Sequence, residues 1–134
     1  MAHRCNYVTF TNAYNRMPLN VAGRICAPDP VDVLAPANQA RLRAEIGDHH
    51  RVLLICGRLA WLAYTGQPQR SGGFSLKSVS SFQQLQLSAA LCKQLNTRLG
   101  SSFTSAWYLG HSRNWHQYPV LDAALKQIGR SAGW

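Results

Sequence analysis

The sequence predicts an α/β fold: a three-layer α/β/α sandwich around a small, mainly parallel sheet. Segments with strand character alternate with segments of helical periodicity, which is typical of parallel strands joined by crossover helices. The run from Arg51 to Cys56 is apolar without alternation, as in a strand buried on both faces. With 46% hydrophobic and 14% charged residues, the chain has the apolar mass for one core, so we expect residues 1–134 to form a single domain.

The first third of the chain is predicted to hold one strand, a long loop and one helix. Tyr7 to Thr11 (YVTFT) is β-branched and aromatic, which favours a strand, and the proline-containing polar stretch behind it favours a loop. From Asp32 to Ile46 the apolar residues recur at roughly helical spacing. We therefore expect a helix that starts near Pro36 and ends at Gly47.

The middle of the chain is predicted to form a strand, a glycine turn and two helices. The strand is RVLLIC, Arg51 to Cys56, and Gly57 begins a helix that Gly66 ends. From Ser81 to Leu99 the large apolar residues lie on one face of a single amphipathic helix closed by Gly100.

The C-terminal part is predicted to form a strand, a loop and a last helix. Phe103 to Leu109 (FTSAWYL) favours a strand, and residues 110–118 (GHSRNWHQY) favour a loop. Pro119 to Ile128 favours a helix with proline in its first turn and Gly129 at its end. In such a fold the ligand crevice is expected at the carboxyl ends of the strands.

The composition favours a polyanionic partner and argues against several kinds of site. Lys and Arg number 14 against 5 Asp and Glu, a net charge of +9, which fits a nucleic-acid partner although basicity alone does not identify one. The few carboxylates argue against a carboxylate-rich metal site. The four cysteines form no CxxC pair, and the His49-His50 pair suits a solvated connector better than a metal site. We expect reduced thiols, no metal and no cofactor.

Nothing in the chain predicts a membrane span or a secretory signal. No apolar run approaches the roughly 20 residues that a membrane helix requires. The first residues, MAHRCNYVTF, lack the apolar block of a signal peptide. We therefore expect a cytoplasmic protein with no membrane partner.

Three strand-end segments are the candidate sites, because loops after the strands of a parallel sheet carry the chemistry of such folds. The first is Asn12, whose amide can donate to and accept from a base edge or, alternatively, cap a turn. The second is Gly57-Arg58, where glycine permits a sharp turn. The third is the loop 110–118, whose basic, aromatic and hydrogen-bonding residues suit phosphates and bases. The alternative for Trp115 and Tyr118 is that they fold back on the core.

These segments together resemble the uracil-DNA glycosylase superfamily. The stretch YVTFTNAYNRMP is similar to a family strand whose terminal Asn reads the flipped pyrimidine. RVLLICGRLAWLAY is similar to the buried strand that a Gly-Arg or Gly-Lys pair joins to a helix, and GHSRN to the loop after the last strand.

The resemblance implies a role for each matched residue. Asn12 would hydrogen-bond the uracil edge, and His111 would stabilise the negative charge that grows on the departing base. The remaining candidates would contact DNA through phosphates or as a wedge in the duplex: Ser112, Arg113, Asn114, Trp115, Arg58 and Arg16.

The sequence also departs from the family pattern. The first strand and first motif of the family, which supply the water-activating Asp or Asn, have no counterpart, and no proline follows His111. Asp29 and Asp32 are candidate replacements, although Asp32 has the character of a helix-start residue. Without a first strand, the sheet edge beside Tyr7 to Thr11 would be unpaired, which predicts a homodimer or a protein partner that completes the sheet.

Two functions remain from different classes. One is a DNA base-excision glycosylase that flips and hydrolyses uracil or another altered base. The alternative is a catalytically inactive DNA-binding or protein-interaction domain of the same fold, as in a phage or mobile-element protein. A nucleotide-binding domain is disfavoured because the chain has neither GxGxxG nor a Walker loop.

Overall fold

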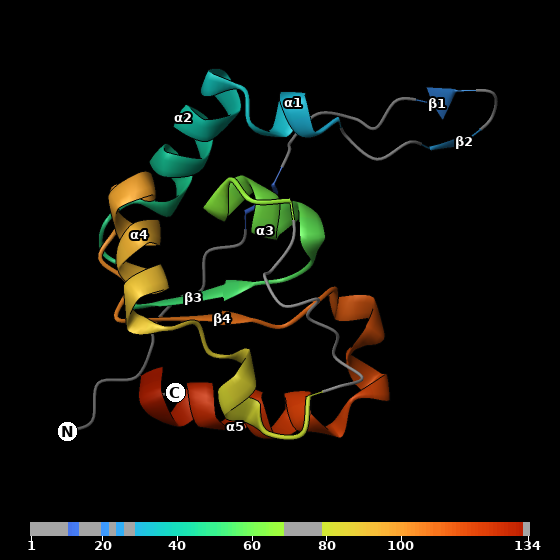
Figure 1. Ribbon diagram of the computed structural model, residues 1–134, viewed down its shortest axis with the longest axis vertical. Coiled ribbons are helices and arrows are strands. Elements are labelled where there is room, and N and C mark those ends of the chain that lie inside the picture. The colour runs from blue at the N-terminus through green and yellow to red at the C-terminus, as the bar shows by residue number, and fades with distance from the viewer. Residues whose placement is uncertain (1–10, 14–19, 22–23, 26–28, 69–78, 133–134) are drawn as a thin grey trace.

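The computed structural model describes residues 11–13, 20–21, 24–25, 29–68 and 79–132. Within these ranges the protein mixes helices with strands, and its longest strands form a small parallel sheet (Figure 1). The predicted strand Tyr7 to Thr11 lies outside the described residues except for Thr11, which is not in a strand. The α/β class is confirmed at this level.

The N-terminal elements are short until α2. β1 (Asn20–Val21) pairs antiparallel with β2 (Arg24–Ile25), and α1 spans Pro30–Val33. The sequence analysis predicts a loop between Thr11 and the helix that starts near Pro36. The prediction is wrong where β1, β2 and α1 form. The α1 helix forms because the Asp29 side chain accepts a hydrogen bond from the backbone N–H of Val31 at 2.9 Å.

The α2 helix spans Pro36–Ile46, and Gly47 follows it at φ 65°, as the sequence predicts. The strands β3 (Val52–Ile55) and β4 (Ser105–Tyr108) pair in parallel, with Val52 opposite Ser105 and Ile55 opposite Tyr108. Helix α3 (Arg58–Thr65) follows β3 and ends at Gly66. These predicted elements are confirmed.

The two faces of the sheet contact separate cores. Leu53, Ile55, Ala106 and Tyr108 belong to the core on the side of α2, α3 and α4, which lie above the sheet in Figure 1. Alternate residues of the same strands, including Leu54 and Trp107, pack into a second core with α5, which lies below the sheet. The strands lack polar alternation because both of their faces are covered.

The predicted helix from Ser81 to Leu99 is wrong in its first half. The structure has a 3-10 helix, η2 (Phe82–Leu85), then an extended link, then α4 (Ala89–Leu99). In the link, the N–H of Leu87 donates to the carbonyl of Ala106 at 2.9 Å, so the chain runs along the edge of β4. Leu85 therefore enters the second core and Leu87 the first. The apolar spacing reflects two cores rather than one helical face.

Two corrections concern the C-terminal part. Residues Ser112–Gln117, predicted as loop, form a 3-10 helix, η3. Helix α5 spans Pro119–Ala132 and so continues beyond Gly129, where the sequence predicts its end. Gly129 is buried within this helix, so the roughly 1 kcal/mol that a glycine costs inside a helix does not end it here.

Candidate functional site

The structure brings the ends of β3 and β4 together. Pairing continues past the strands, because the N–H of Leu109 donates to the carbonyl of Ile55 at 2.9 Å. The next residues therefore emerge side by side: a Cβ placed on Gly57 would lie 3.7 Å from Cδ2 of His111. His111 is exposed, and so is Arg58, the first residue of α3. His111 and Arg58 thus follow the carboxyl ends of the two parallel strands, as the sequence predicts for these two segments.

Glycine is required at position 57 by the backbone. Its φ of 106° and ψ of 171° lie in a region that residues with a Cβ rarely adopt. This conformation turns the chain from β3 directly into α3, and the turning residue itself lies against His111. The glycine therefore sets the geometry of the candidate site.

The basic loop is described only in part. Ser112, Arg113 and Asn114 lie in η3, directly after His111, but their side chains are outside the described residues. Arg16 also lies outside them.

Trp115 has a structural contact. Its Nε1–H donates to the carbonyl of Leu109 at 3.0 Å and lies 3.4 Å from that of Gly110. The half-buried ring packs against the second core, as does that of Tyr118. The alternative in which both aromatics fold back on the core therefore describes the structure, and the indole N–H of Trp115 is engaged by the protein itself.

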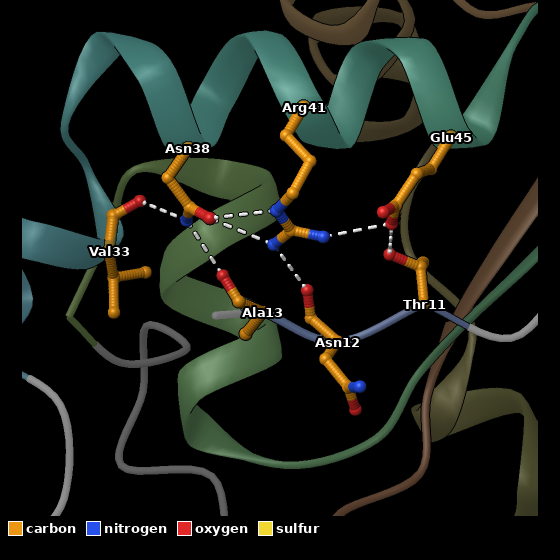
Figure 2. Close-up of polar contacts among 7 residues, drawn as sticks. All are labelled: Thr11, Asn12, Ala13, Val33, Asn38, Arg41 and Glu45. Atoms are coloured by element: carbon orange, nitrogen blue, oxygen red, sulfur yellow. Dashed lines mark hydrogen bonds and ion pairs between the residues drawn. The ribbon is translucent and has the colours of Figure 1, made fainter. Parts of the chain in front are cut away.

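Asn12 is held by α2. Its backbone carbonyl accepts a hydrogen bond of 2.7 Å from the Arg41 guanidinium, and its exposed side chain points away from that helix (Figure 2). The contacts described for Asn12 thus come from α2, whereas those that position His111 come from the Gly57 turn. The described contacts do not join Asn12 to His111.

Sequence reasoning missed the polar face of α2 that holds this segment. Asn38, Arg41 and Glu45 lie three and four residues apart, so they share one helix face, and Figure 2 shows them turned toward residues 11–13. Asn38 is 7% exposed and the neighbouring Gln39 8% exposed, although both are polar. The spacing of these polar residues was the available signal, but a helix is ordinarily predicted from its apolar face.

Burial and hydrogen bonding shift three ionisable groups near this face. A hydrogen bond from Thr11, and the adjacent Arg41, hold the pKa of Glu45 below its usual value of 4.5 despite some desolvation. Burial, with a contribution from Cys56, raises the pKa of Tyr64 to about 12. Burial also raises the pKa of the Cys56 thiol. Tyr64 and Cys56 are therefore neutral near pH 7, which does not suit Cys56 as a nucleophile.

Several carboxylates have structural contacts. Asp29 caps α1, Glu45 binds Arg41, and Asp122 lies 3.1 Å from Lys126 in α5. Asp32 lies in the first turn of α1. The contacts of Asp29 are therefore those of a helix cap.

Metal-binding residue types are not grouped in the described part of the chain. No three His, Cys, Asp or Glu side chains gather there in a way that would hold a metal ion. The rings of His49 and His50 lie 4.3 Å apart, and desolvation and the charge of His49 lower the pKa of His50. Cys56 and Cys92 are free thiols. Among the described helices, none is both long and apolar enough to span a bilayer.

Comparison with known proteins adds no relative. No protein-family model matches the chain, and neither the curated proteins nor the solved structures give a match. The functional argument therefore rests on the residues and contacts of this chain.

Proposed function

We propose that this protein binds DNA and acts as a base-excision glycosylase on uracil or another altered base. The observation that supports it best is the exposed His111 imidazole against Gly57, the residue that precedes Arg58 and the start of α3. The carboxyl end of a parallel sheet is where such folds bind ligands. In the finer form of this proposal, the helices on both faces of the sheet belong to a three-layer α/β/α sandwich like that of the uracil-DNA glycosylase superfamily.

Hydrolysis breaks the bond between the base and C1′ of the sugar, and a water molecule forms the new bond to C1′ and gives up a proton that ends on the departing base. His111 and Asn12 would act on the base in this reaction. Loss of a base from its sugar places negative charge on the departing base, and a hydrogen-bond donor at His111 would stabilise it. Asn12 would recognise the base edge through its amide. Arg58 would contact phosphate, and the net charge of +9 would add non-specific affinity for DNA.

The test is release of free uracil from a duplex with one uracil, measured at protein in excess over DNA. His111→Ala is expected to lower the rate by about 100-fold or more, the effect of removing one charge-stabilising donor. His116→Ala is the matched control, because His116 is an exposed histidine of η3. This substitution removes the same kind of side chain a few residues away from His111. Equal effects of the two substitutions would contradict the proposed role of His111.

The second candidate function is DNA binding without base excision. It is favoured by the contacts of two carboxylates. Asp29 accepts a hydrogen bond from the backbone of Val31, and Glu45 accepts hydrogen bonds from Arg41 and Thr11, so both have structural partners rather than the task of activating water. Under this alternative the wild-type protein binds duplex DNA with a steep dependence on salt and releases no base at any protein concentration. The same two assays therefore distinguish the candidates.

A protein partner is a further part of the proposal. The outer edge of β4 is partly occupied by the bridge from Gln86 to Trp107, so we expect a second chain to pair on the side of β3. Light scattering distinguishes a homodimer from a monomer of 14.9 kDa.

A further inference from the structure

Three hydrogen bonds tie the short segment Thr11 to Ala13 to one face of α2 (Figure 2). Arg41 donates to the carbonyl of Asn12 at 2.7 Å, and the Asn38 amide donates to the carbonyl of Ala13 at 2.7 Å. The hydroxyl of Thr11 donates to Glu45 at 2.5 Å. Each of three consecutive residues is therefore held by a different side chain of the same helix.

The side chains that hold the segment also hold one another. The Arg41 guanidinium binds Glu45 through Nη1 at 2.8 Å, and it binds the Asn38 oxygen through Nε at 3.2 Å and Nη2 at 2.8 Å. The Asn38 amide nitrogen also donates to the carbonyl of Val33 at 2.7 Å, which fixes the orientation of the amide. Because their geometry is mutually determined, Asn38 and Arg41 form a rigid receptor for the carbonyls of Asn12 and Ala13.

These contacts use the backbone of Asn12 and leave its amide directed elsewhere. The Asn12 side chain is exposed and extends away from α2, on the far side of the segment from Arg41 (Figure 2). An exposed asparagine on a segment with no regular secondary structure ordinarily samples several orientations. Here the adjacent peptide groups are fixed, so the backbone of Asn12 has less conformational freedom left to lose when the amide binds a partner.

We infer that Arg41 and Asn38 are positioning residues, which act through the backbone of Asn12 to present its amide to a nucleobase. This inference rests on the proposed function, in which Asn12 recognises the base. Neither Arg41 nor Asn38 needs to touch the base. A lysine at position 41 would keep the charge but lose the planar array of donors that binds Asn12, Asn38 and Glu45 together.

The experiment compares two duplexes that differ only in one uracil or thymine in a mismatch with guanine. Arg41→Lys is expected to lower the preference for the uracil duplex about 10-fold, while affinity for the thymine duplex stays unchanged because the charge is retained. Asn38→Ala should lower the preference similarly. Arg43→Lys is the matched control, since Arg43 lies on the same helix and donates to the carbonyl of Arg98 instead.

A second background separates positioning from general damage. If Arg41 acts through Asn12, Arg41→Lys should cause no further loss of preference in a protein that already carries Asn12→Ala. Independent, additive losses, or an equal loss of affinity for both duplexes, would overturn the positioning role.

A measurement without DNA distinguishes failure of this inference from failure of the proposed function. Backbone amide relaxation by NMR should show residues 12 and 13 ordered in the wild type and more mobile on the nanosecond timescale in Arg41→Lys. Unchanged order in the variant would overturn the inference. If order is lost in Arg41→Lys as expected but the wild type shows no uracil preference, Asn12 does not recognise a base. The proposed role of Arg41 and Asn38 in base recognition then fails as well, although their contacts would still order residues 12 and 13.

Discussion

A Cβ on Gly57 would lie 3.7 Å from Cδ2 of His111, although α3, η2, α4 and β4 all lie between these residues along the chain. The contact follows from the parallel pairing of β3 and β4, whose carboxyl ends must lie at one edge. Space for a methyl group exists at this distance, so the requirement for glycine comes from its φ of 106°.

Gly57→Ala is therefore expected to destabilise the protein by about 2–3 kcal/mol, because its φ and ψ lie in the region almost reserved for glycine. Gly100 is the matched control: its φ of 63° and ψ of 37° are left-handed helical, and a Cβ there would meet no atom of the described segments within 4 Å. Gly100→Ala should cost about 1 kcal/mol. Urea unfolding of both variants measures the difference, and equal losses would contradict the backbone explanation.

Most of the helices and strands around the carboxyl end of β3 and β4 could be predicted from the sequence. Fewer of the contacts between these elements could be predicted. β3, α3 and β4 carry strong local signals: an all-apolar run, glycines at the turns and a helical repeat. The break before α4 was missed because Leu85 and Leu87 fit a helical stripe as well as they fit two cores. Which core a leucine enters is decided by the pairing of Leu87 with Ala106, a contact between residues far apart in sequence.

The polar face of α2 was missed for a related reason. Asn38 is polar, and polar residues on a helix are ordinarily expected to face solvent. It is buried because its partners, the carbonyls of Ala13 and Val33, approach from other segments. The periodicity of the α2 sequence does not show which carbonyls of other segments will lie against the helix. Asn12 and His111 were predicted as site residues from their places after strand-like runs, and their roles stay predictions.

The break before α4 gives a second prediction. Ser88 precedes the helix, and its hydroxyl accepts a hydrogen bond from the N–H of Leu91 at 3.2 Å. Ser88→Ala should destabilise the protein by about 1 kcal/mol, as is usual for loss of an N-terminal cap. Ser88→Asp should retain most of the stability, because a carboxylate accepts the same bond and suits the positive end of the helix dipole. Thermal unfolding of the wild type and the two variants ranks their stabilities. A Ser88→Ala variant as stable as the wild type would contradict the capping role.

Trp115 provides a third prediction, which separates a structural role from a DNA contact. Trp115→Phe removes the hydrogen bond to Leu109 and should destabilise the protein by about 1 kcal/mol beyond the loss of ring area. Trp107→Phe is the control, because the buried Nε1–H of Trp107 has no hydrogen-bond partner among the described residues. DNA affinity should be unchanged in Trp115→Phe. A loss of DNA affinity at unchanged stability would instead assign Trp115 to the DNA surface.

Glu45 gives a fourth prediction, on pH. Its pKa is held below the ordinary value of 4.5, chiefly by the hydrogen bond from Thr11, so folding is favoured by the charged form. The stabilisation is fully present above the pKa of the unfolded chain and is lost as the pH falls through the lower pKa of the folded protein. The difference in unfolding free energy between the wild type and Glu45→Gln should therefore be constant above about pH 5.5 and shrink below about pH 4.5. Because the Glu45 side chain is 41% exposed, we expect a difference below about 1 kcal/mol.

Thr11→Val tests the cause of this pH dependence. Valine has nearly the shape of threonine but cannot donate to Glu45, so the pKa of Glu45 should rise toward its ordinary value while the contact with Arg41 at 2.8 Å remains. The pH dependence of the Glu45→Gln difference should accordingly be smaller in the Thr11→Val background. If it is unchanged, the ion pair with Arg41 rather than the Thr11 hydroxyl controls the carboxylate, and the N-terminal segment contributes little to the charge of this helix face.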